Sequence, residues 1–212
     1  MIFVILGFFA LAGLLYSEYT HHKRLKWIFK PAASVLFLAT AVSRGPASTY
    51  DWLILGGLVA GFLGDVFLIV EHQRWFLAGL VVFLLGHILY VFAFNSQVGF
   101  AELSPVLLIA IAFLSAAFYG WLSPHLGEMR MPVFAYVLVI TAMVWSAWAV
   151  YFETDTKEEF RRLVIVGATC FYASDMAVAI DRFVQPKFKN AFWGLPLYYA
   201  GQFMLALSIG II

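Results

Sequence analysis

The chain has 212 residues, of which 64% are hydrophobic and 12% are charged, and its formal net charge is +1. Because soluble globular domains usually carry about 45–50% apolar and about 25% charged residues, this composition excludes an ordinary soluble fold and indicates an all-α polytopic membrane protein. The near-neutral charge also predicts no nucleic-acid partner, which would require a clustered basic face.

Mostly apolar stretches recur along the chain, and a membrane-spanning helix needs about 17–25 such residues. We expect a bundle of about eight transmembrane helices in one integral membrane domain, 1–212: 2–17, 31–43, 52–70, 75–95, 103–122, 132–152, 161–180 and 193–212. The first two are short, so one of them could be partly re-entrant or extended by flanking residues. The chain starts apolar without the basic region of a cleaved signal peptide, so 2–17 is expected to be a retained helix.

The Lys and Arg residues predict the orientation, because basic residues concentrate in cytoplasmic loops. Nine of the 13 lie in the loops after the first, third, fifth and seventh helices: Lys23, Arg24, Lys26, Lys30, Arg74, Arg130, Arg182, Lys187 and Lys189. The opposite loops hold Arg44, Lys157, Arg161 and Arg162. We therefore expect those four odd loops in the cytoplasm and both termini on the non-cytoplasmic side.

Short matches between the two halves of the chain point to an internal repeat. Asp65 and Asp175 are each followed six positions later by an acidic residue, Glu71 and Asp181 respectively. Two prolines are expected to open the second and sixth helices, where proline fits the first turn: Pro31 and Pro132. Four helices repeated once in parallel would give this 4+4 pattern, and chance similarity is the alternative.

Two aspartates lie inside the predicted membrane segments. Asp65 and Asp175 each stand five residues before the expected cytoplasmic end of a helix, roughly 8 Å inside at 1.5 Å per residue. Such a placement costs about 2.5–3.5 kcal/mol on insertion scales. Gly57 and Gly61 share a helix face with Asp65, and small residues there let helices approach closely. Equal depth favours a shared functional role, and structural hydrogen bonds to neighbouring helices are the alternative.

Other polar residues in the apolar segments are candidates for binding a substrate. His87 could position a ligand or shuttle a proton, and Tyr90 follows it by three residues on the same helix. Tyr198, Tyr199 and Gln202 lie together in the last helix. The alternative roles are hydrogen bonds between helices and, for Tyr198, membership of an interfacial aromatic belt.

Charged residues at the predicted membrane edge are open to two interpretations. Lys30 is expected where the second helix leaves the cytoplasm, and it could snorkel to the headgroups or bind a lipid phosphate as a point charge. Four further residues are interpreted as rim residues, with some of them paired: Glu71, Arg74, Asp181 and Arg182.

Signatures of soluble hydrolases and of cofactor sites are missing. The sequence has no G-x-S-x-G, H-E-x-x-H or Walker A motif. Its one cysteine, Cys170, excludes an intrachain disulfide and is expected to pack as a small apolar residue. One deep histidine cannot build a zinc site. We therefore expect no metal and no other cofactor, and an enzyme of this kind would have to work with carboxylates and bound water.

The sequence resembles the YhhN-like lysoplasmalogenase family. No single motif is specific, but their order and spacing along nearly the whole chain carry the resemblance. The residues concerned are Lys30-Pro31, Gly64-Asp65-Val66-Phe67-Leu68, Phe76 with Gly79, Phe83 with His87 and Tyr90, Ser174-Asp175, and Tyr198-Tyr199 with Gln202.

The resemblance implies an enzyme of the bacterial inner (cell) membrane that takes a lysophospholipid as substrate. It would hydrolyse the vinyl ether bond of lysoplasmalogens to a fatty aldehyde and glycerophosphoethanolamine or glycerophosphocholine. A carboxylic acid can protonate a vinyl ether, and a second, ionised carboxylate can stabilise the cation or activate water. Asp65 and Asp175 are the candidates for this pair. The candidates for substrate binding, with Lys30 on the phosphate, are Lys30, His87, Tyr90, Tyr198, Tyr199 and Gln202.

Two other functional classes compete with this reading. A proton-coupled membrane transporter of a lipid or small molecule would also carry paired acidic residues and a repeat. Against it, both aspartates lie toward one side of the membrane rather than at its midplane. A zinc-dependent lipid hydrolase of the ceramidase type would need several histidines, and the other four are predicted in loops: His21, His22, His72 and His125.

Overall fold

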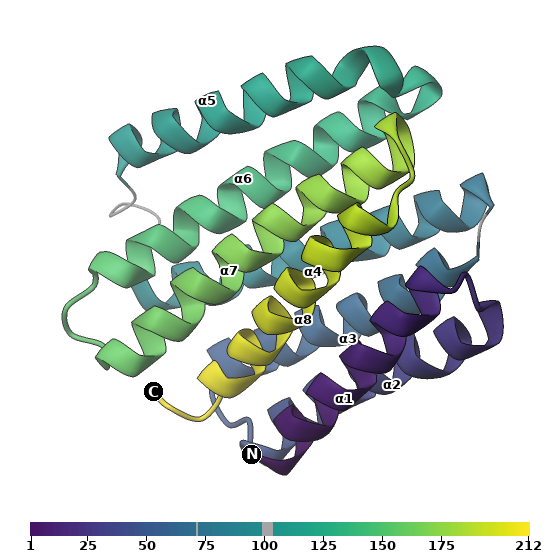
Figure 1. Cartoon of the computed structure of the whole chain (residues 1–212). Coiled ribbons are helices and arrows are strands. Elements are labelled where there is room, and N and C mark those ends of the chain that lie inside the picture. The colour runs from purple at the N-terminus through teal and green to yellow at the C-terminus, as the bar shows by residue number, and fades with distance from the viewer. Residues whose placement is uncertain (71, 99–103) are drawn as a thin grey trace.

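The computed structural model describes residues 1–70, 72–98 and 104–212, and these residues form an all-α structure (Figure 1). A π-helix, Ile180–Val184, continues α7, and the 3-10 turns Ser123–His125 and Gly127–Met129 join α5 to α6. The prediction of an all-α chain of eight helices is confirmed within these residues. The α-helices are α1 (Ile2–Tyr19), α2 (Lys23–Ser43), α3 (Thr49–Ile69), α4 (Gln73–Val98), α5 (Pro105–Leu122), α6 (Arg130–Phe152), α7 (Glu158–Ala179) and α8 (Phe188–Ser208).

Helices α1 to α7 are long and apolar enough to cross a membrane. Large apolar side chains such as Phe8, Phe9 and Phe113 face outward, where lipid would cover them. The chain is therefore a polytopic membrane protein. Helix α8 is not apolar enough to meet the same criterion, because it carries buried polar residues. It nevertheless runs along the bundle beside α7 (Figure 1). Both chain termini lie at the same end of the bundle (Figure 1).

The clearest departure from the predicted helix ends is in α2. This helix begins at Lys23, so Pro31 lies in its interior instead of opening it, and Lys30 lies inside the bundle rather than at a helix entrance. The charged residues before Pro31 concealed the first two turns, although charges on a helix that extends beyond the hydrocarbon are well solvated. Pro132 lies in the first turn of α6, as predicted.

Smaller differences affect the other predicted ends. Helix α8 starts at Phe188 and stops at Ser208, about one turn earlier than predicted at each end. Helix α7 gains the π-helical segment at its end. Glu71, one of the acidic pair on which the predicted repeat rests, and Leu103, the predicted start of the fifth helix, lie outside the described residues.

Helix packing places corresponding helices of the two halves in corresponding positions. Helix α3 packs along α4 as α7 packs along α8, and α1 contacts α2 as α5 contacts α6. Helix α2 contacts α3 and α8, whereas α6 contacts α7 and α4. These are the pairings that a 4+4 repeat requires, although the repeat itself stays a prediction.

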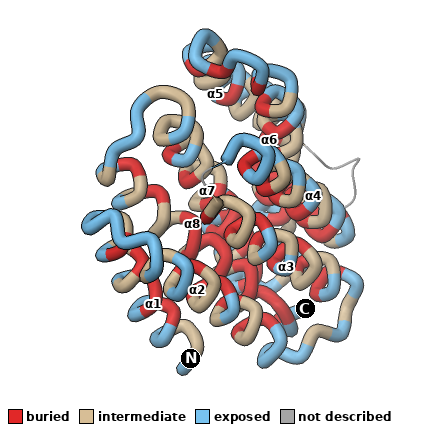
Figure 2. Tube along the Cα trace, turned by 90° about the vertical axis from the view of Figure 1, so that its right-hand side faces the viewer, coloured by how far each residue is buried: buried red, intermediate tan, exposed pale blue. Residues whose placement is uncertain are grey.

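Helices at the edge of the bundle are less buried than those at its centre. Figure 2 shows buried residues on the inward faces of the helices and exposed residues on the outer faces. Helix α8 is among the most enclosed, with buried residues from Asn190 to Ser208. Helix α5 lies at the edge of the bundle, and only Ser115 and Leu122 of this helix are buried. The polar residues of α8 are therefore held in the interior, where they need partners.

Candidate active site

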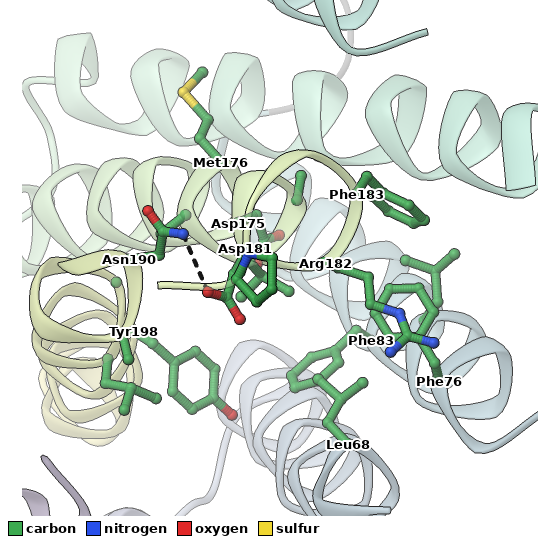
Figure 3. Close-up of a pocket in the computed structure, with 18 of the residues that line it drawn as sticks. Leu68, Phe76, Phe83, Asp175, Met176, Asp181, Arg182, Phe183, Asn190 and Tyr198 are labelled. Carbon is green, nitrogen blue, oxygen red and sulfur yellow. Dashed lines mark hydrogen bonds between the residues drawn. The ribbon is translucent and has the colours of Figure 1, made fainter. Parts of the chain in front are cut away.

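A cavity of about 690 Å³ lies at the end of the bundle where α1, α3, α5 and α7 end. Figure 3 shows Asp175, Phe83 and Tyr198 among the side chains that converge on it. Apolar side chains such as Leu80 and Ile140 form much of the remaining wall. Because the loops at this end hold most of the Lys and Arg residues, we call the opening there the cavity mouth and expect it to face the cytoplasm.

Asp65 lies in one wall of the cavity and is surrounded by donors. Ser34 Oγ and Tyr198 OH each lie 2.7 Å from its Oδ2 atom, and Lys30 Nζ lies 3.3 Å from Oδ1. The carboxylate is only 2% exposed. A carboxyl group that accepts hydrogen bonds on both oxygens and pairs with an ammonium has the environment of an ionised carboxylate. We call Lys30, Ser34, Asp65, Tyr198 and Tyr199 the Asp65 cluster, since Tyr199 OH donates to Lys30 O at 3.2 Å.

A chain of hydrogen bonds leads from α4 to Asp65. Tyr90 OH donates to Gln202 Oε1 at 3.0 Å, and Gln202 Nε2 donates to Tyr198 OH at 3.1 Å. Tyr198 OH in turn donates to Asp65. Each hydroxyl and amide therefore points its hydrogen toward Asp65, which keeps four buried polar groups paired.

Glycines of α3 make room for this chain. A side chain at Gly57 would overlap the Tyr90 ring, and one at Gly61 would overlap the Gln202 amide. The Gly57, Gly61 and Asp65 face predicted from the sequence is therefore the face on which α4 and α8 approach α3. The close approach lets Gln202 bridge two tyrosines from different helices.

Asp175 lies in another wall and has fewer partners. Tyr136 OH donates to its Oδ2 atom at 2.5 Å, and no other described residue donates to this carboxyl group. Its side chain is 21% exposed and lines the cavity. One carboxyl oxygen of Asp175 is thus available to a molecule in the cavity.

His87 stands behind Asp175 and has one unpaired nitrogen. Its Nδ1 atom lies 2.7 Å from the Phe83 carbonyl oxygen, which can only accept, so Nδ1 carries hydrogen. Nε2 lies 4.0 Å from Asp175 Oδ2 and is a buried atom without a hydrogen-bond partner in the described structure. In the neutral imidazole this nitrogen is a proton acceptor directed at Asp175. We call His87, Tyr136 and Asp175 the Asp175 cluster.

Aromatic rings separate the two clusters. The Tyr198 ring packs edge-on against Phe83 and Phe171, with centroids 5.9 and 5.2 Å away. Phe171 also packs edge-on against His87 at 4.5 Å. Among the described residues, no hydrogen bond or ion pair joins Asp65 to Asp175. The two carboxyl groups therefore line one cavity but have different hydrogen-bond and ion-pair partners.

Two pairs of cluster residues recur in the two halves at similar spacings. Asp175 follows Asp65 by 110 positions, and Tyr198 follows His87 by 111. Asp65 of α3 meets Tyr198 of α8, and Asp175 of α7 faces His87 of α4. Each aspartate is thus faced by a residue from a helix of the other half of the chain. One side uses a tyrosine that donates a hydrogen bond and the other a histidine that does not.

Nothing in the described residues resembles a metal-binding cluster. No group of three or more His, Cys, Asp or Glu side chains lies close enough together there to hold an ion. The polar side chains that line the cavity include carboxylates, phenols and cations. Such a set suits proton transfer and the binding of a charged headgroup.

Comparison with known proteins identifies the family of this chain. The sequence pattern of the YhhN family matches residues 25–209, which include every residue of the two clusters. The chain belongs to the YhhN family. No solved structure matches it.

Several curated relatives of this YhhN-family chain are named lysoplasmalogenases. Lysoplasmalogenase TMEM86B of Rattus norvegicus is 33% identical over 175 residues, which cover 82% of this chain and 67% of the relative. Lysoplasmalogenase TMEM86A of Bos taurus is 33% identical over 184 residues, 86% of this chain and 72% of the relative. The lysoplasmalogenase of Mycobacterium tuberculosis is 32% identical over 174 residues, 79% of this chain and 64% of the relative.

The candidates named from the sequence of this YhhN-family chain fall into two groups. Four of them line the cavity: Lys30, Asp65, Asp175 and Tyr198. The other four lie behind its wall: His87, Tyr90, Tyr199 and Gln202. Tyr90, Tyr199 and Gln202 reach the cavity through hydrogen bonds, and His87 does so by facing Asp175.

Sequence reasoning missed two cluster residues of this family member. Ser34 lies one turn after Lys30 on the same face of α2, but α2 was predicted to begin after that lysine. Tyr136 lies in the second turn of α6, where a tyrosine is equally well explained by an interfacial aromatic belt. Only the packing of α6 against α7 places its hydroxyl on Asp175.

Proposed function

We propose that this protein is a membrane-embedded lysoplasmalogenase, which hydrolyses the vinyl ether bond of lysoplasmalogens by carboxylate acid–base catalysis. The products are a fatty aldehyde and glycerophosphoethanolamine or glycerophosphocholine. The observation that carries the proposal is Asp175, a carboxyl group partly open to the cavity beside a buried histidine nitrogen without a partner. Membership of the YhhN family and the names of the relatives supply the substrate class.

The cavity suits a lipid with one chain. Its mouth carries charged residues such as Lys26, Arg182 and Lys187, whereas residues such as Leu80 and Ile140 give it apolar walls. A lysoplasmalogen has the same division, with a charged headgroup at one end and an alkenyl chain at the other. We place the headgroup at the mouth, the chain against the apolar walls, and the vinyl ether near Asp175.

Asp175 is the proposed general acid. Asp65 already accepts hydrogen bonds from Ser34 and Tyr198 and pairs with the Lys30 ammonium, so we assign it the ionised form. Asp175 has a single donor, Tyr136, and is exposed to the cavity. A protonated Asp175 can therefore present its hydroxyl to the double bond, and Tyr136 then stabilises the carboxylate that remains.

The reaction is balanced with one water molecule. Asp175 gives its proton to the carbon beta to the ether oxygen, leaving an oxocarbenium ion. Water adds to the carbon bonded to oxygen and loses a proton, which restores the acid. The resulting hemiacetal collapses to the aldehyde and the free glycerol hydroxyl. Asp65, held ionised by Lys30, stabilises the cation or orients the water through Tyr198, and the proton of that water returns to Asp175.

The other candidates act through these two groups in the proposal. His87 exchanges a proton with Asp175 between turnovers, because its Nε2 atom faces that carboxyl group. Gln202 and Tyr90 orient the Tyr198 hydroxyl. Lys30 was expected to bind phosphate. Since its ammonium pairs with Asp65, we instead assign it to keeping that carboxylate ionised.

Aldehyde release by the purified protein in detergent tests the proposal. We expect aldehyde from a lysoplasmalogen and none from the matched lysolipid with a saturated ether, because only the vinyl ether can be protonated to an oxocarbenium ion. Asp175→Asn and Asp65→Asn should each lower turnover by at least about a hundredfold, the usual scale of general acid–base catalysis.

A monodisperse elution profile on size exclusion is the control for folding of both variants. Unchanged turnover in either Asn variant would remove that aspartate from the mechanism. If the folded wild-type protein releases no aldehyde, the proposed reaction is wrong. Uptake of unchanged lipid into vesicles would then support the transporter.

A further inference from the structure

The segment joining α7 to α8 forms part of the cavity mouth and is held in place by hydrogen bonds. Gln185 N donates to Ile180 O at 2.9 Å, which closes the π-helix. Asp181 Oδ1 accepts from Lys187 N at 3.0 Å and from Asn190 Nδ2 at 3.1 Å (Figure 3). Asp181 therefore has a structural role, since its carboxylate fixes the segment between α7 and α8. π-Helical turns are frequent at functional sites, and this one places the next residue, Arg182, at the mouth.

Arg182 stacks on an aromatic platform. Its guanidinium carbon lies 4.6 Å from the centroid of the Phe76 ring, and Phe183 packs edge-on against the same ring at 5.5 Å. Figure 3 shows Arg182 beside Phe76 at the edge of the cavity. The contact with the ring restrains the planar guanidinium, and the Arg182 side chain is exposed and lines the cavity mouth.

Among the cations that line the cavity, Lys26 and Lys30 are paired with carboxylates, whereas Arg182 and Lys187 have no such partner among the described residues. Lys26 Nζ pairs with Glu18 at 2.8 Å, and Lys30 Nζ pairs with Asp65 at 3.3 Å. In the described part of the chain, no carboxylate lies within ion-pair distance of Arg182. The guanidinium of Arg182 is thus oriented at the cavity mouth, and no carboxylate of a described residue neutralises it.

A phosphate diester is the ligand that fits such a group. The guanidinium fork matches two phosphate oxygens, and a guanidinium already held on a ring loses less conformational freedom on binding. Arg182 follows Asp175 by seven residues, so it lies on the order of 10 Å further along the helix toward the mouth. An arginine side chain and a glycerol backbone together can bridge that separation between a phosphate and a vinyl ether.

We propose that Arg182 binds the phosphate of the lysophospholipid and so selects for phosphorylated substrates and places their vinyl ether at Asp175. The inference rests on the proposed function for the identity of the lipid. It assigns to Arg182 the role that the sequence suggested for Lys30, because Lys30 is already paired.

Equilibrium binding to the purified protein in dodecyl maltoside, which carries no phosphate, tests the inference. The probes are a saturated 1-O-alkyl lysophosphocholine and the matching 1-O-alkylglycerol, neither of which has a vinyl ether. We expect wild type to prefer the phosphorylated probe by about tenfold or more, the scale of a charged hydrogen bond. Arg182→Gln should abolish most of that preference, and Arg182→Lys should restore part of it.

Arg74→Gln is the matched control. Arg74 is exposed at the same end of the bundle and does not line the cavity, so its variant should keep the full preference. Equal preference in wild type and in Arg182→Gln, with both proteins monodisperse, would overturn the inference. If the preference depends on Arg182 but the wild type releases no aldehyde, the phosphate site stands and the proposed reaction fails.

A third arm separates the substrate from ordinary membrane lipid as the source of the phosphate. Diacyl phosphatidylglycerol is added as a competitor of the alkyl lysophosphocholine. Weak competition supports a site for the lysolipid in the cavity. Competition as strong as that of the lysolipid itself, lost in Arg182→Gln, would show that Arg182 holds a boundary lipid and would overturn its role in selecting substrate.

Discussion

At the scale of single residues, the two aspartates show how neighbours decide chemistry. Both lie near the same end of their helices, but Asp65 accepts from Ser34 and Tyr198 and pairs with Lys30, whereas Asp175 accepts only from Tyr136. Several donors favour the ionised form of a buried carboxyl group, whereas a carboxyl group with one donor more easily keeps a proton. The same side chain thus suits two different tasks.

The hydroxyl of Tyr136 permits a direct test of this assignment. Tyr136→Phe removes the only described donor to Asp175, so the carboxylate formed after proton transfer loses one hydrogen bond. We expect kcat for aldehyde release to fall by about tenfold, or about 1.4 kcal/mol of barrier, with little change in KM. Steady-state kinetics on the lysoplasmalogen measure both constants.

The control for this variant is Tyr119→Phe. The Tyr119 hydroxyl donates to the Arg130 carbonyl and its side chain does not line the cavity. That variant should keep the wild-type kcat. An equal loss of kcat in both variants, or no loss in Tyr136→Phe, would contradict a role for Tyr136 in stabilising Asp175.

At the scale of elements, the packing of α3 against α4 and α8 brings the polar network together. Gly57 and Gly61 bring the backbone of α3 close to Tyr90 and Gln202, and the resulting hydrogen bonds offset the cost of burying polar groups of α8. The low apolarity of α8 follows from this arrangement, because a helix enclosed by other helices needs no lipid-facing stripe.

Gly61 tests whether this close approach matters for stability. In Gly61→Ala the new Cβ would overlap Gln202 Nε2, which would have to move away from Tyr198. We expect a loss of about 1–3 kcal/mol in stability, seen as a lower midpoint of thermal unfolding in detergent. Hydrolysis should weaken as well, since Gln202 orients Tyr198.

Gly120→Ala provides the matched helix substitution. No atom lies within 4 Å of a Cβ built at Gly120 in α5, so this change should leave the midpoint unchanged or raise it slightly. Similar midpoints for the two alanine variants would mean that the α3–α8 contact does not require glycine.

At the scale of the whole molecule, the cavity is a product of the bundle rather than of any one segment. Its lining includes Glu18 of α1, Leu122 of α5 and Asn190 of α8, which are far apart in the sequence. Both chain termini lie at the end of the bundle opposite the cavity mouth (Figure 1). With α8 counted as a crossing, the even number of crossings and the excess of basic residues at the mouth together predict a cytoplasmic mouth and external termini.

Labelling of single cysteines in intact cells tests this topology. In a Cys170→Ala background, Ile2→Cys and Ile212→Cys should react with a membrane-impermeant maleimide from outside, because both positions are exposed at the same end. Lys189→Cys, exposed near the mouth, should react only after permeabilisation. Reaction of Ile212→Cys and Lys189→Cys from one side would mean that α8 does not cross the membrane.

The sequence by itself determined the class of protein, most helix positions and the place of the two aspartates near the same end of their helices. Composition and the lengths of the apolar stretches are local properties, and lipid as the solvent makes them decisive. The same local reading placed the start of α2 at Pro31, because it treated charged residues as a loop although they lie on a helix that extends into water.

Only the tertiary structure decided the partners of each polar group. Hydrogen bonds from Ser34 and Tyr136 to the two aspartates cross between helices and leave no periodic signal in the sequence. The pairing of Lys30 with Asp65 and the unpaired state of Arg182 also depend on distances between segments. Depth in a membrane follows from position along one helix, whereas protonation and ligand binding follow from which helices are neighbours.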